Sequence, residues 1–338
     1  EAGSAGSQCV ECHMPGRNYM VVDNRRDHSL RVPRPDRAAA TGSPDACTAC
    51  HRGQKPEWAA GKLREWLGRP PAGLQDYAEI LQAGDTAAAG SRERLLELAG
   101  NLRQPAIARA SALQRLDRIT GPEMLNAVGA LLRDPNPLVR RAAAAAHRLA
   151  PVDLRAGLIS VLDDPVRDVR LEATPLVAEM PASALQPAQA AARDRAMAEY
   201  VASQEVNADR PESHVNLGLL YAATGRHAEA RAEFEQAISI DPRFVPATVN
   251  LADLLRVMGA EAQAEAILRS GIEAGPGDAA LHHALGLLLV RTGRPDAALA
   301  ELKEAAERQP AEARYGYVYA VALESAGRRK EAIQVLRQ

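Results

Sequence analysis

The segment VNLGLLYAATGRHAEARAEFEQAISIDP, residues 215–242, decides the fold of the C-terminal part of the chain. Its apolar residues recur 34 positions further on (217 to 251) and again after the same interval (251 to 285). The recurring positions are Leu217, Leu251 and Leu285; Ala230, Ala264 and Ala298; and Phe234, Leu268 and Leu302. A fixed period of this length is typical of a helical repeat array, in which each copy is one pair of helices.

Small residues and residues that end helices recur at the same interval of 34 positions (225 to 259). Glycines stand at Gly225, Gly259, Gly293 and Gly327, where the first helix of each pair has to end in a left-handed residue. Prolines at Pro242, Pro276 and Pro310 end or follow the second helix. Small residues such as Gly218, Gly286 and Ala230 allow the paired helices to approach closely.

This register resembles the tetratricopeptide repeat (TPR) over residues 211–338. Residues 193–210 match a preceding half repeat, with Ala196 and Tyr200 at the positions of Ala230 and Phe234. Gly271 stands where alanine is usual, and we expect it to loosen its helix.

A second repeat, with a period of 30 (134 to 164), precedes the first. Asp134-Pro135 recurs as Asp164-Pro165, and Val139 recurs as Val169. We expect the aspartate to cap a helix, the proline to occupy its first turn and the valine to face the core. The pattern resembles short HEAT-like repeats over residues 91–182, with an introductory helix at 74–83.

Length and composition agree with an all-α repeat protein. The 338 residues are 46% hydrophobic but only 3% aromatic, so alanine and leucine supply the core, which suits closely packed helices. We expect three domains, residues 1–73, 74–182 and 183–338, with the two arrays stacked into one right-handed α-solenoid that offers its surface to protein partners.

Charge and hydropathy argue against nucleic acid as a partner and against a membrane-spanning segment. A net charge of −2 argues against a nucleic-acid-binding role. The sequence contains no apolar stretch long enough to form a transmembrane segment. The chain begins with Glu1 instead of Met, and we expect it to be a processed or trimmed product whose signal peptide is not in this chain.

All four cysteines lie near the N-terminus in two C-x-x-C-H motifs. Cys9, Cys12 and His13 form the first, and Cys47, Cys50 and His51 form the second. This is the attachment motif of c-type haem: two thiols three positions apart form thioethers to one haem, and the next residue supplies the proximal imidazole. The sequence therefore predicts two haem c groups with His13 and His51 as axial iron ligands.

Two other interpretations of the cysteines stay open. Four thiolates in two C-x-x-C pairs are able to bind one tetrahedral zinc ion, although the separation of Cys12 and Cys47 is long for such a site. In an oxidising compartment the same residues are able to form disulfides.

A c-type haem usually takes a second axial ligand, histidine or methionine. His28 is the only other histidine before residue 147, so we predict it as the distal ligand of one haem. Met20 is the alternative, whereas Met14 directly follows His13 and is poorly placed to reach the far face of the same haem. The second distal ligand is expected from outside this chain, which suggests the C-terminal part of a larger multihaem protein.

The order of haem segment, HEAT-like repeats and TPR array resembles that of multihaem c-type cytochromes with TPR tails. The fold class expected is all-α, with a mostly irregular dihaem c-type cytochrome segment followed by an α-solenoid. The resemblance implies electron transfer in the periplasm or outside the cell, further haem motifs upstream, and redox proteins or other haem subunits as partners. An oxidoreductase acting on a small nitrogen or sulfur compound and a zinc-stabilised protein-binding scaffold are the alternatives. An electron-transfer protein is favoured over an enzyme.

Three further sets of residues have weaker functional interpretations. His282 and His283 are adjacent on a helix and diverge too far to share a metal ion; the repeat register assigns His282 to packing and His283 to the groove. Asn216 and Asn250 occupy equivalent groove positions, but the lysines of a carboxylate clamp are missing. The arginine-rich residues 25–35 suit haem propionates or, equally, a solvated loop.

Overall fold

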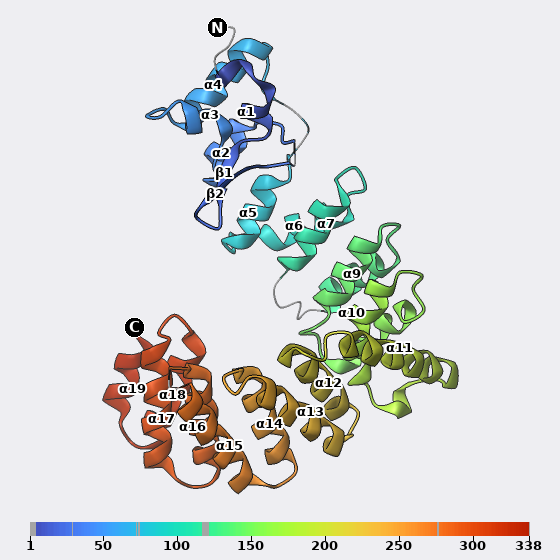
Figure 1. Cartoon of the computed structure of the whole chain (residues 1–338), viewed down its shortest axis with the longest axis vertical. Coiled ribbons are helices and arrows are strands. Elements are labelled where there is room, and N and C mark those ends of the chain that lie inside the picture. Colours follow the sequence, from blue (N-terminus) through green and yellow to red (C-terminus); the bar gives the residue numbers. More distant parts are fainter. Residues whose placement is uncertain are drawn as a thin grey trace. The chain divides into compact units, whose positions relative to one another are not determined.

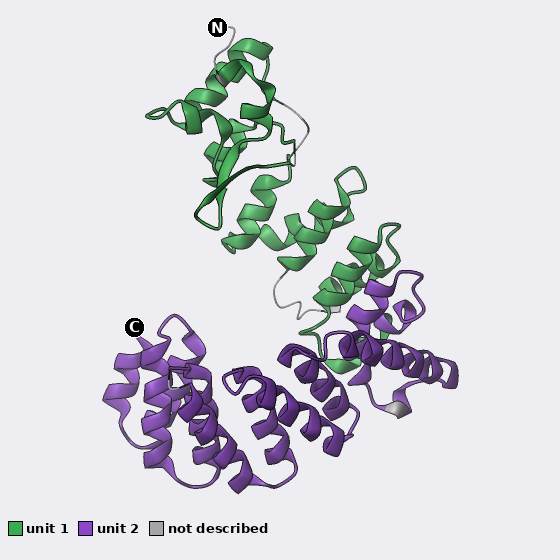
Figure 2. Ribbon diagram, in the orientation of Figure 1, with its two compact units in different colours: residues 1–157 green, residues 158–338 purple. Residues whose placement is uncertain are grey.

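The computed structural model describes residues 5–28, 30–71, 73, 75–116, 122–275 and 277–337. These residues are mostly helical, with one two-stranded sheet, and the chain divides into two compact units, residues 1–157 and 158–338 (Figures 1 and 2). The domain borders expected after residues 73 and 182 stay predictions, and Leu74, at the first of them, lies outside the described residues. None of the described helices combines the length and the apolar composition needed to cross a bilayer.

The first unit begins with short helices and a hairpin and continues as paired helices. Its elements are η1 (Ala5–Ser7), α1 (Cys9–His13), β1 (Gly16–Tyr19), β2 (Asp23–Arg26), α2 (Pro35–Thr41), α3 (Ala46–Cys50), α4 (Pro56–Leu67), α5 (Ala78–Asp85), α6 (Ser91–Gly100), α7 (Ala106–Gln114), α8 (Pro122–Ala130), η2 (Leu131–Arg133), α9 (Pro137–Ala146) and η3 (Val152–Leu154). η4 (Ala156–Val161) crosses the boundary between the units.

The N-terminal segment contains more regular structure than the sequence suggested. β1 and β2 pair antiparallel, with Gly16 opposite Arg26 and Tyr19 opposite Asp23. Every residue of the hairpin is exposed, so no alternation of apolar and polar residues marks it in the sequence. The helices here are only one to three turns long, which is too short for a clear helical period.

The predicted core valines of the 30-residue repeat are fully buried: Val139 in α9 and Val169 in α10 (Arg167–Ala178). The predicted caps differ. Asp134 and Asp164 each accept a hydrogen bond from the backbone N–H two residues on, at 2.9 and 2.8 Å, and so close the turn before the helix. The N-cap of α9 is Asn136, because the Asp-Pro pair lies too far upstream of the first helical residue.

The introductory helix expected at 74–83 is α5, which begins at Ala78 and ends at Asp85. Its neighbours in the first unit are α2, α6 and α7, so it connects the N-terminal segment to the paired helices. The likeness of this region to HEAT repeats stays a prediction.

The second unit is a stack of helical hairpins. Its elements are α10 (Arg167–Ala178), η5 (Ala182–Ala184), α11 (Pro187–Glu205), α12 (Pro211–Ala223), α13 (His227–Ile240), α14 (Val245–Val257), α15 (Glu261–Ala274), α16 (Ala279–Arg291), α17 (Pro295–Arg308), α18 (Ala313–Ser325) and α19 (Arg329–Leu336). Successive helices pack against each other, and α14 also packs against α12 and α16 (Figure 1).

The 34-residue register describes the core of this stack. All of its apolar positions are buried: Leu217, Leu251, Leu285, Ala230, Ala264, Ala298, Phe234, Leu268 and Leu302. The four predicted glycines have φ between 74° and 77°, a left-handed conformation that favours glycine. Pro242 and Pro310 follow α13 and α17 as predicted, whereas Pro276 lies outside the described residues.

The structure also shows the half repeat before the first full repeat and the helix that contains Gly271. The half repeat expected at 193–210 begins inside the longer helix α11, which ends at Glu205, and Ala196 and Tyr200 are buried as expected. Gly271 does not loosen its helix, because α15 runs unbroken from Glu261 to Ala274. A methyl group at Gly271 would lie 2.8 Å from Cγ2 of Thr248, so glycine is needed there for close packing.

Candidate functional site

Both C-x-x-C-H motifs fold as a single helical turn. Cys9, Cys12 and His13 make up most of α1, whereas Cys47 and Cys50 lie in α3 with His51 as its C-cap residue. Residues three apart on a helix share one face, so each pair of thiols points to the same side of its helix. α1 contacts α3, and the two motifs are therefore neighbours in the first unit.

His13 is held by two hydrogen bonds with Arg31. The Nδ1 of His13 lies 2.7 Å from the carbonyl oxygen of Arg31, and the backbone N–H of Arg31 donates to the carbonyl of His13 at 2.9 Å. A carbonyl oxygen can only accept, so Nδ1 is the donor, and in the neutral imidazole the lone pair is then on Nε2. A histidine that ligates a metal through Nε2 almost always donates its other N–H in this manner.

The hairpin holds α1 in place through Arg26 at the end of β2. Its guanidinium pairs with Glu11 at 2.5 Å and donates to the carbonyl of Met14 at 3.2 Å. These contacts satisfy a carbonyl at the C-terminal end of α1, where a cation is also favoured by the helix dipole.

The second motif is capped by Asp45. Its carboxylate accepts hydrogen bonds from the backbone N–H groups of Cys47 and Thr48 at 2.8 and 3.1 Å. Burial, with the nearby Asp45 carboxylate and Cys12, raises the pKa of the Cys47 thiol to about 11. The ring of His51 packs against Trp58 of α4, with centroids 4.9 Å apart.

A pocket of about 360 Å³ lies beside the first motif. Cys12 lines it together with residues of α2 and α3, and four arginines also contribute to the lining: Arg17, Arg31, Arg34 and Arg37. Its volume is within the usual range for ligand pockets, and guanidinium groups match carboxylates in geometry and charge.

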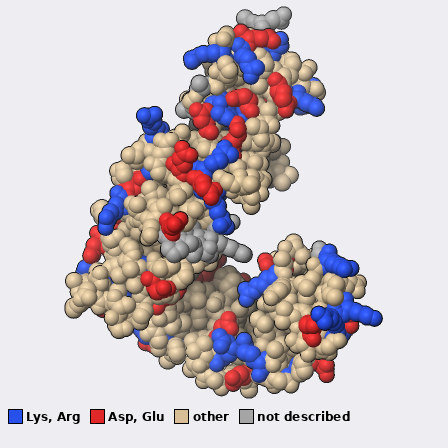
Figure 3. All heavy atoms as spheres, turned by 180° about the vertical axis from the view of Figure 1, so that it is seen from behind, with Lys and Arg blue, Asp and Glu red and all other residues tan. Residues whose placement is uncertain are grey.

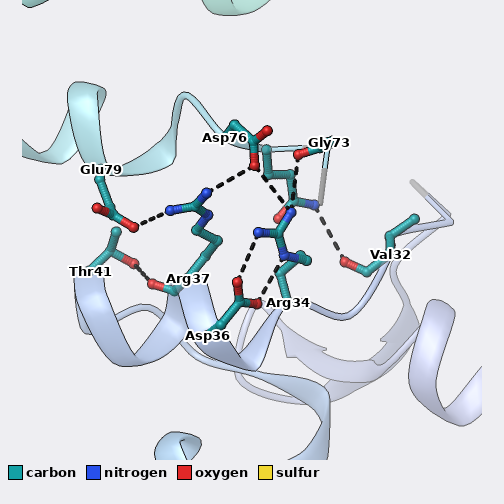
Figure 4. Close-up of polar contacts among 9 residues, drawn as sticks. Val32, Arg34, Asp36, Arg37, Thr41, Gly73, Asp76 and Glu79 are labelled. Atoms are coloured by element: carbon teal, nitrogen blue, oxygen red, sulfur yellow. Dashed lines mark hydrogen bonds and ion pairs between the residues drawn. The ribbon is translucent and has the colours of Figure 1, made fainter. Parts of the chain in front are cut away.

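Arg34 and Arg37 are fixed by an ion-pair network that joins α2 to the segment before α5 (Figure 4). Arg34 is buried and makes two hydrogen bonds to Asp36, at 2.9 and 2.8 Å, and one to the carbonyl of Gly73 at 3.1 Å. Arg37 pairs with Asp76 at 2.9 Å and also with Glu79. Hydrogen bonds between Arg34 and Asp36 raise the pKa of the guanidinium and lower the pKa of the carboxyl.

The residues of the two motifs therefore fit c-type haem in chemistry. Each offers two thiols on one helical face and an adjacent imidazole, and all four cysteines are free thiols. The Nδ1 hydrogen bond of His13 is the observation that fits an iron ligand most specifically. Among the described residues, three or more His, Cys, Asp and Glu side chains nowhere gather into a metal-ion cluster.

The predicted distal ligand His28 and its alternative Met20 are both exposed to solvent. His28 lies exposed in the turn after β2. Met20, at the tip of the hairpin, is 77% exposed and has φ of 48°. Met14 is the half-buried C-cap residue of α1.

The weaker candidates in the repeats have mostly local partners. The Nδ1 of His282 lies 2.7 Å from Glu301, which agrees with a packing role, and His283 lines a pocket. Asn216 donates to Gln204 at 3.0 Å and Asn250 donates to the carbonyl of Pro246 at 2.7 Å, so part of their hydrogen-bonding capacity is used within the chain.

Sequence reasoning missed the Arg34–Asp36–Asp76 network and the arginines around His283. The basic stretch at 25–35 was a signal for the first, but nothing in it shows that Arg34 is buried. The face of the molecule in Figure 3 shows basic and acidic side chains interspersed, as expected for a net charge of −2.

Comparison with known proteins identifies the repeats. Models of the tetratricopeptide repeat match residues 221–288, 182–243 and 283–338. Together these matches cover residues 182–338, so the C-terminal part of the chain consists of tetratricopeptide repeats. No curated protein matched the sequence.

Several solved structures align with part of the chain. MamA from Desulfovibrio magneticus RS-1 is 19% identical, with 43% of this chain and 80% of that chain covered and a TM-score of 0.34. Another MamA crystal structure is 21% identical, with 43% and 84% covered and a TM-score of 0.36. YrrB, described as a TPR protein with an unusual peptide-binding site, is 22% identical, with 43% and 74% covered and a TM-score of 0.33. TM-scores this low establish no common overall structure.

The repeats also define what this part of the chain does in general terms. Stacked helical repeats present extended surfaces on which other proteins bind. Residues 182–338 are accordingly a protein–protein interaction scaffold, with protein partners on the repeat surface.

Proposed function

We propose that the chain is an electron-transfer cytochrome that carries one haem c on each C-x-x-C-H motif and docks its partners through the repeats. The observation that supports haem best is His13, whose Nδ1 is bonded to the Arg31 carbonyl and whose Nε2 is left for iron. A chain that acted only as a protein-binding scaffold would not require a histidine held in this tautomer.

Bound haem supplies one-electron transfer at its iron, and the chain supplies attachment and orientation. Cys9 and Cys12 lie on one face of α1, so both thiols are able to reach one macrocycle. The bond to Arg31 fixes the plane of the His13 ring and raises the basicity of Nε2. Cys47, Cys50 and His51 have the same roles on α3.

The contact between α1 and α3 supports transfer within a haem pair. Both attachment helices belong to one unit and are neighbours, so two haems carried by these motifs would have adjacent supports. Cys9 and Cys50 are exposed, so each motif has a side open to a redox partner or to another haem subunit.

The arginines of the pocket beside Cys12 are suited to haem propionates. Arg34 and Arg37 are already neutralised by Asp36, Asp76 and Glu79, so they add rigidity to the pocket wall. Arg17 is exposed at the same pocket and is the cation we assign to a propionate.

The remaining parts of the proposal concern ligands and location. His28 is proposed as the distal ligand of one haem, and the other distal ligand is supplied from outside this chain. Haem attachment to such motifs implies export, so the protein works in the periplasm or outside the cell.

Paired cysteine variants test the proposal against a zinc site. In protein from its native host, Cys47→Ala with Cys50→Ala should lower the haem content by one per chain. Cys9→Ala with Cys12→Ala is the matched control and should remove the other haem. If all four cysteines hold one zinc ion instead, either double variant loses the whole site and the wild type contains zinc without haem. That result would overturn the proposal.

A further inference from the structure

A second pocket, of about 240 Å³, lies among the helices of three consecutive repeats. It is lined by residues of α14, α15, α16 and α18, and its apolar wall includes Val249, Leu268, Leu287 and Leu288. Except for α15, these are the first helices of their pairs. The volume and the aliphatic wall suit a short, branched hydrocarbon group.

His283 is an unusual residue for the wall of this pocket. The equivalent positions one and two repeats earlier are Val249 and Val215, so the repeat pattern predicts an apolar side chain at position 283. His283 is only 6% exposed, and within the described part of the chain neither of its ring nitrogens has a hydrogen-bond partner. A buried polar group without a partner costs free energy, which an entering ligand would recover.

Two arginine side chains also line this pocket. Arg291, at the end of α16, and Arg314, at the start of α18, both line it and are exposed. Neither guanidinium has an ion pair or hydrogen bond to any residue that the structure describes. The one acidic lining residue, Asp253, is paired with Arg256 at 3.4 Å. Neither arginine is ion-paired among the residues described, and although Asp253 and Glu261 act on Arg291 from a distance, burial and Arg256 outweigh them and lower its pKa.

This charge is particular to one pair of repeats. One repeat earlier, Val257 and Ala280 stand where Arg291 and Arg314 lie, so the arginines are not a periodic surface feature. The ring of the half-buried Tyr315 packs at a tilt against His283, with centroids 4.7 Å apart, and Arg314 lies near enough to act on the imidazole electrostatically. Burial and the charge of Arg314 lower the pKa of His283, and at neutral pH its ring therefore has one N–H to donate.

We propose that this pocket binds a carboxylate on a short aliphatic group, and that the C-terminal residue of a partner polypeptide is its source. Arg291 and Arg314 pair with the carboxylate, His283 donates a hydrogen bond to an oxygen, and the aliphatic wall receives the side chain. A carboxylate is the favoured ligand because its two oxygens are able to accept hydrogen bonds from both guanidinium groups and from the imidazole at the same time. The inference rests on the docking role of the repeats and makes that role specific.

Calorimetric titration of the full chain tests this inference. The probes are an N-acetylated alanine tripeptide extended by a C-terminal leucine, the same peptide as its C-terminal amide, and 4-methylpentanoate. The free acid should bind, and the amide should bind about tenfold more weakly or worse. Binding of 4-methylpentanoate as strong as that of the peptide would overturn the polypeptide C-terminus as the source of the carboxylate and assign the pocket to a small carboxylic acid.

Variants place the binding in the pocket. Arg314→Gln and His283→Phe should each weaken binding of the free acid about tenfold. Arg269→Gln is the matched control, because Arg269 lies on α15, is exposed and pairs with Glu265 away from the pocket; its affinity should equal that of the wild type. Equal binding of acid and amide, absence of binding, or an equal loss in Arg269→Gln would overturn the inference. Haem content is measured separately, so failure here leaves the cytochrome proposal standing, and the reverse also holds.

Discussion

Replacing Gly218 by alanine tests how closely the helices of a repeat have to approach. Gly218 lies inside α12, and a methyl group on it would be within 2.8 Å of three ring atoms of Phe234 in α13. Such separations do not occur for real carbon contacts, and the Phe234 ring is only 1% exposed. A rigid buried ring has little room to yield, so we expect α12 and α13 to move apart.

The magnitude follows from two opposing effects. Overpacking a core usually costs about 1 to 3 kcal/mol. Alanine in place of glycine inside a helix contributes about 1 kcal/mol in the other direction. The free energy of unfolding of Gly218→Ala should therefore fall by up to about 2 kcal/mol.

Gly316→Ala is the matched control. Gly316 lies inside α18, and a methyl group there would meet only Cγ1 of Val335, at 3.9 Å. This variant should gain stability by up to about 1 kcal/mol. Urea unfolding followed by far-UV circular dichroism measures both changes. A Gly218→Ala protein as stable as Gly316→Ala would refute the argument that the repeat register places these glycines for close packing.

Two further predictions concern the N-terminal network and one concerns the iron ligands. Arg34→Gln should lower the free energy of unfolding by about 1 to 3 kcal/mol, because it leaves Asp36 and Asp76 without their buried partner; thermal unfolding measures this. The pKa of Asp36 is lowered in the folded state, so its contribution is present above its ordinary pKa and is lost as the pH falls through the folded value. The stability difference between wild type and Arg34→Gln should accordingly shrink between about pH 5 and pH 2, and a constant difference would contradict the pairing. His28→Ala should convert one haem to the high-spin form without lowering the haem content, and an unchanged absorption spectrum would remove His28 from the ligand set.

The repeats were predictable because their information is local and is repeated. A glycine with positive φ, such as Gly225, ends a helix for reasons confined to its own turn. Leu251 and Leu285 are buried because the same spacing recurs in every copy. The predicted looseness at Gly271 was wrong because the space there is filled by Thr248, a residue of the preceding helix.

The candidate site could be predicted only in part. The six motif residues follow from their spacing, since one helical turn sets the positions of two thiols and an imidazole. The bond from His13 to Arg31 depends on the intervening hairpin, whose exposed polar strands leave no pattern in the sequence. The ion pair between Arg34 and Asp76 joins residues that are remote in sequence, and the lack of hydrogen-bond partners for His283 is visible only once the helices are packed.

The absorption spectrum of the protein from its native host, oxidised and then reduced with dithionite, tests the central proposal most directly. A pyridine haemochrome assay on the same sample gives the number of haems per chain. We expect a c-type spectrum and two haems per chain, one for each C-x-x-C-H motif. Protein without a haem band and with one bound zinc ion per chain would contradict the proposal and leave a zinc-stabilised segment on a protein-binding scaffold.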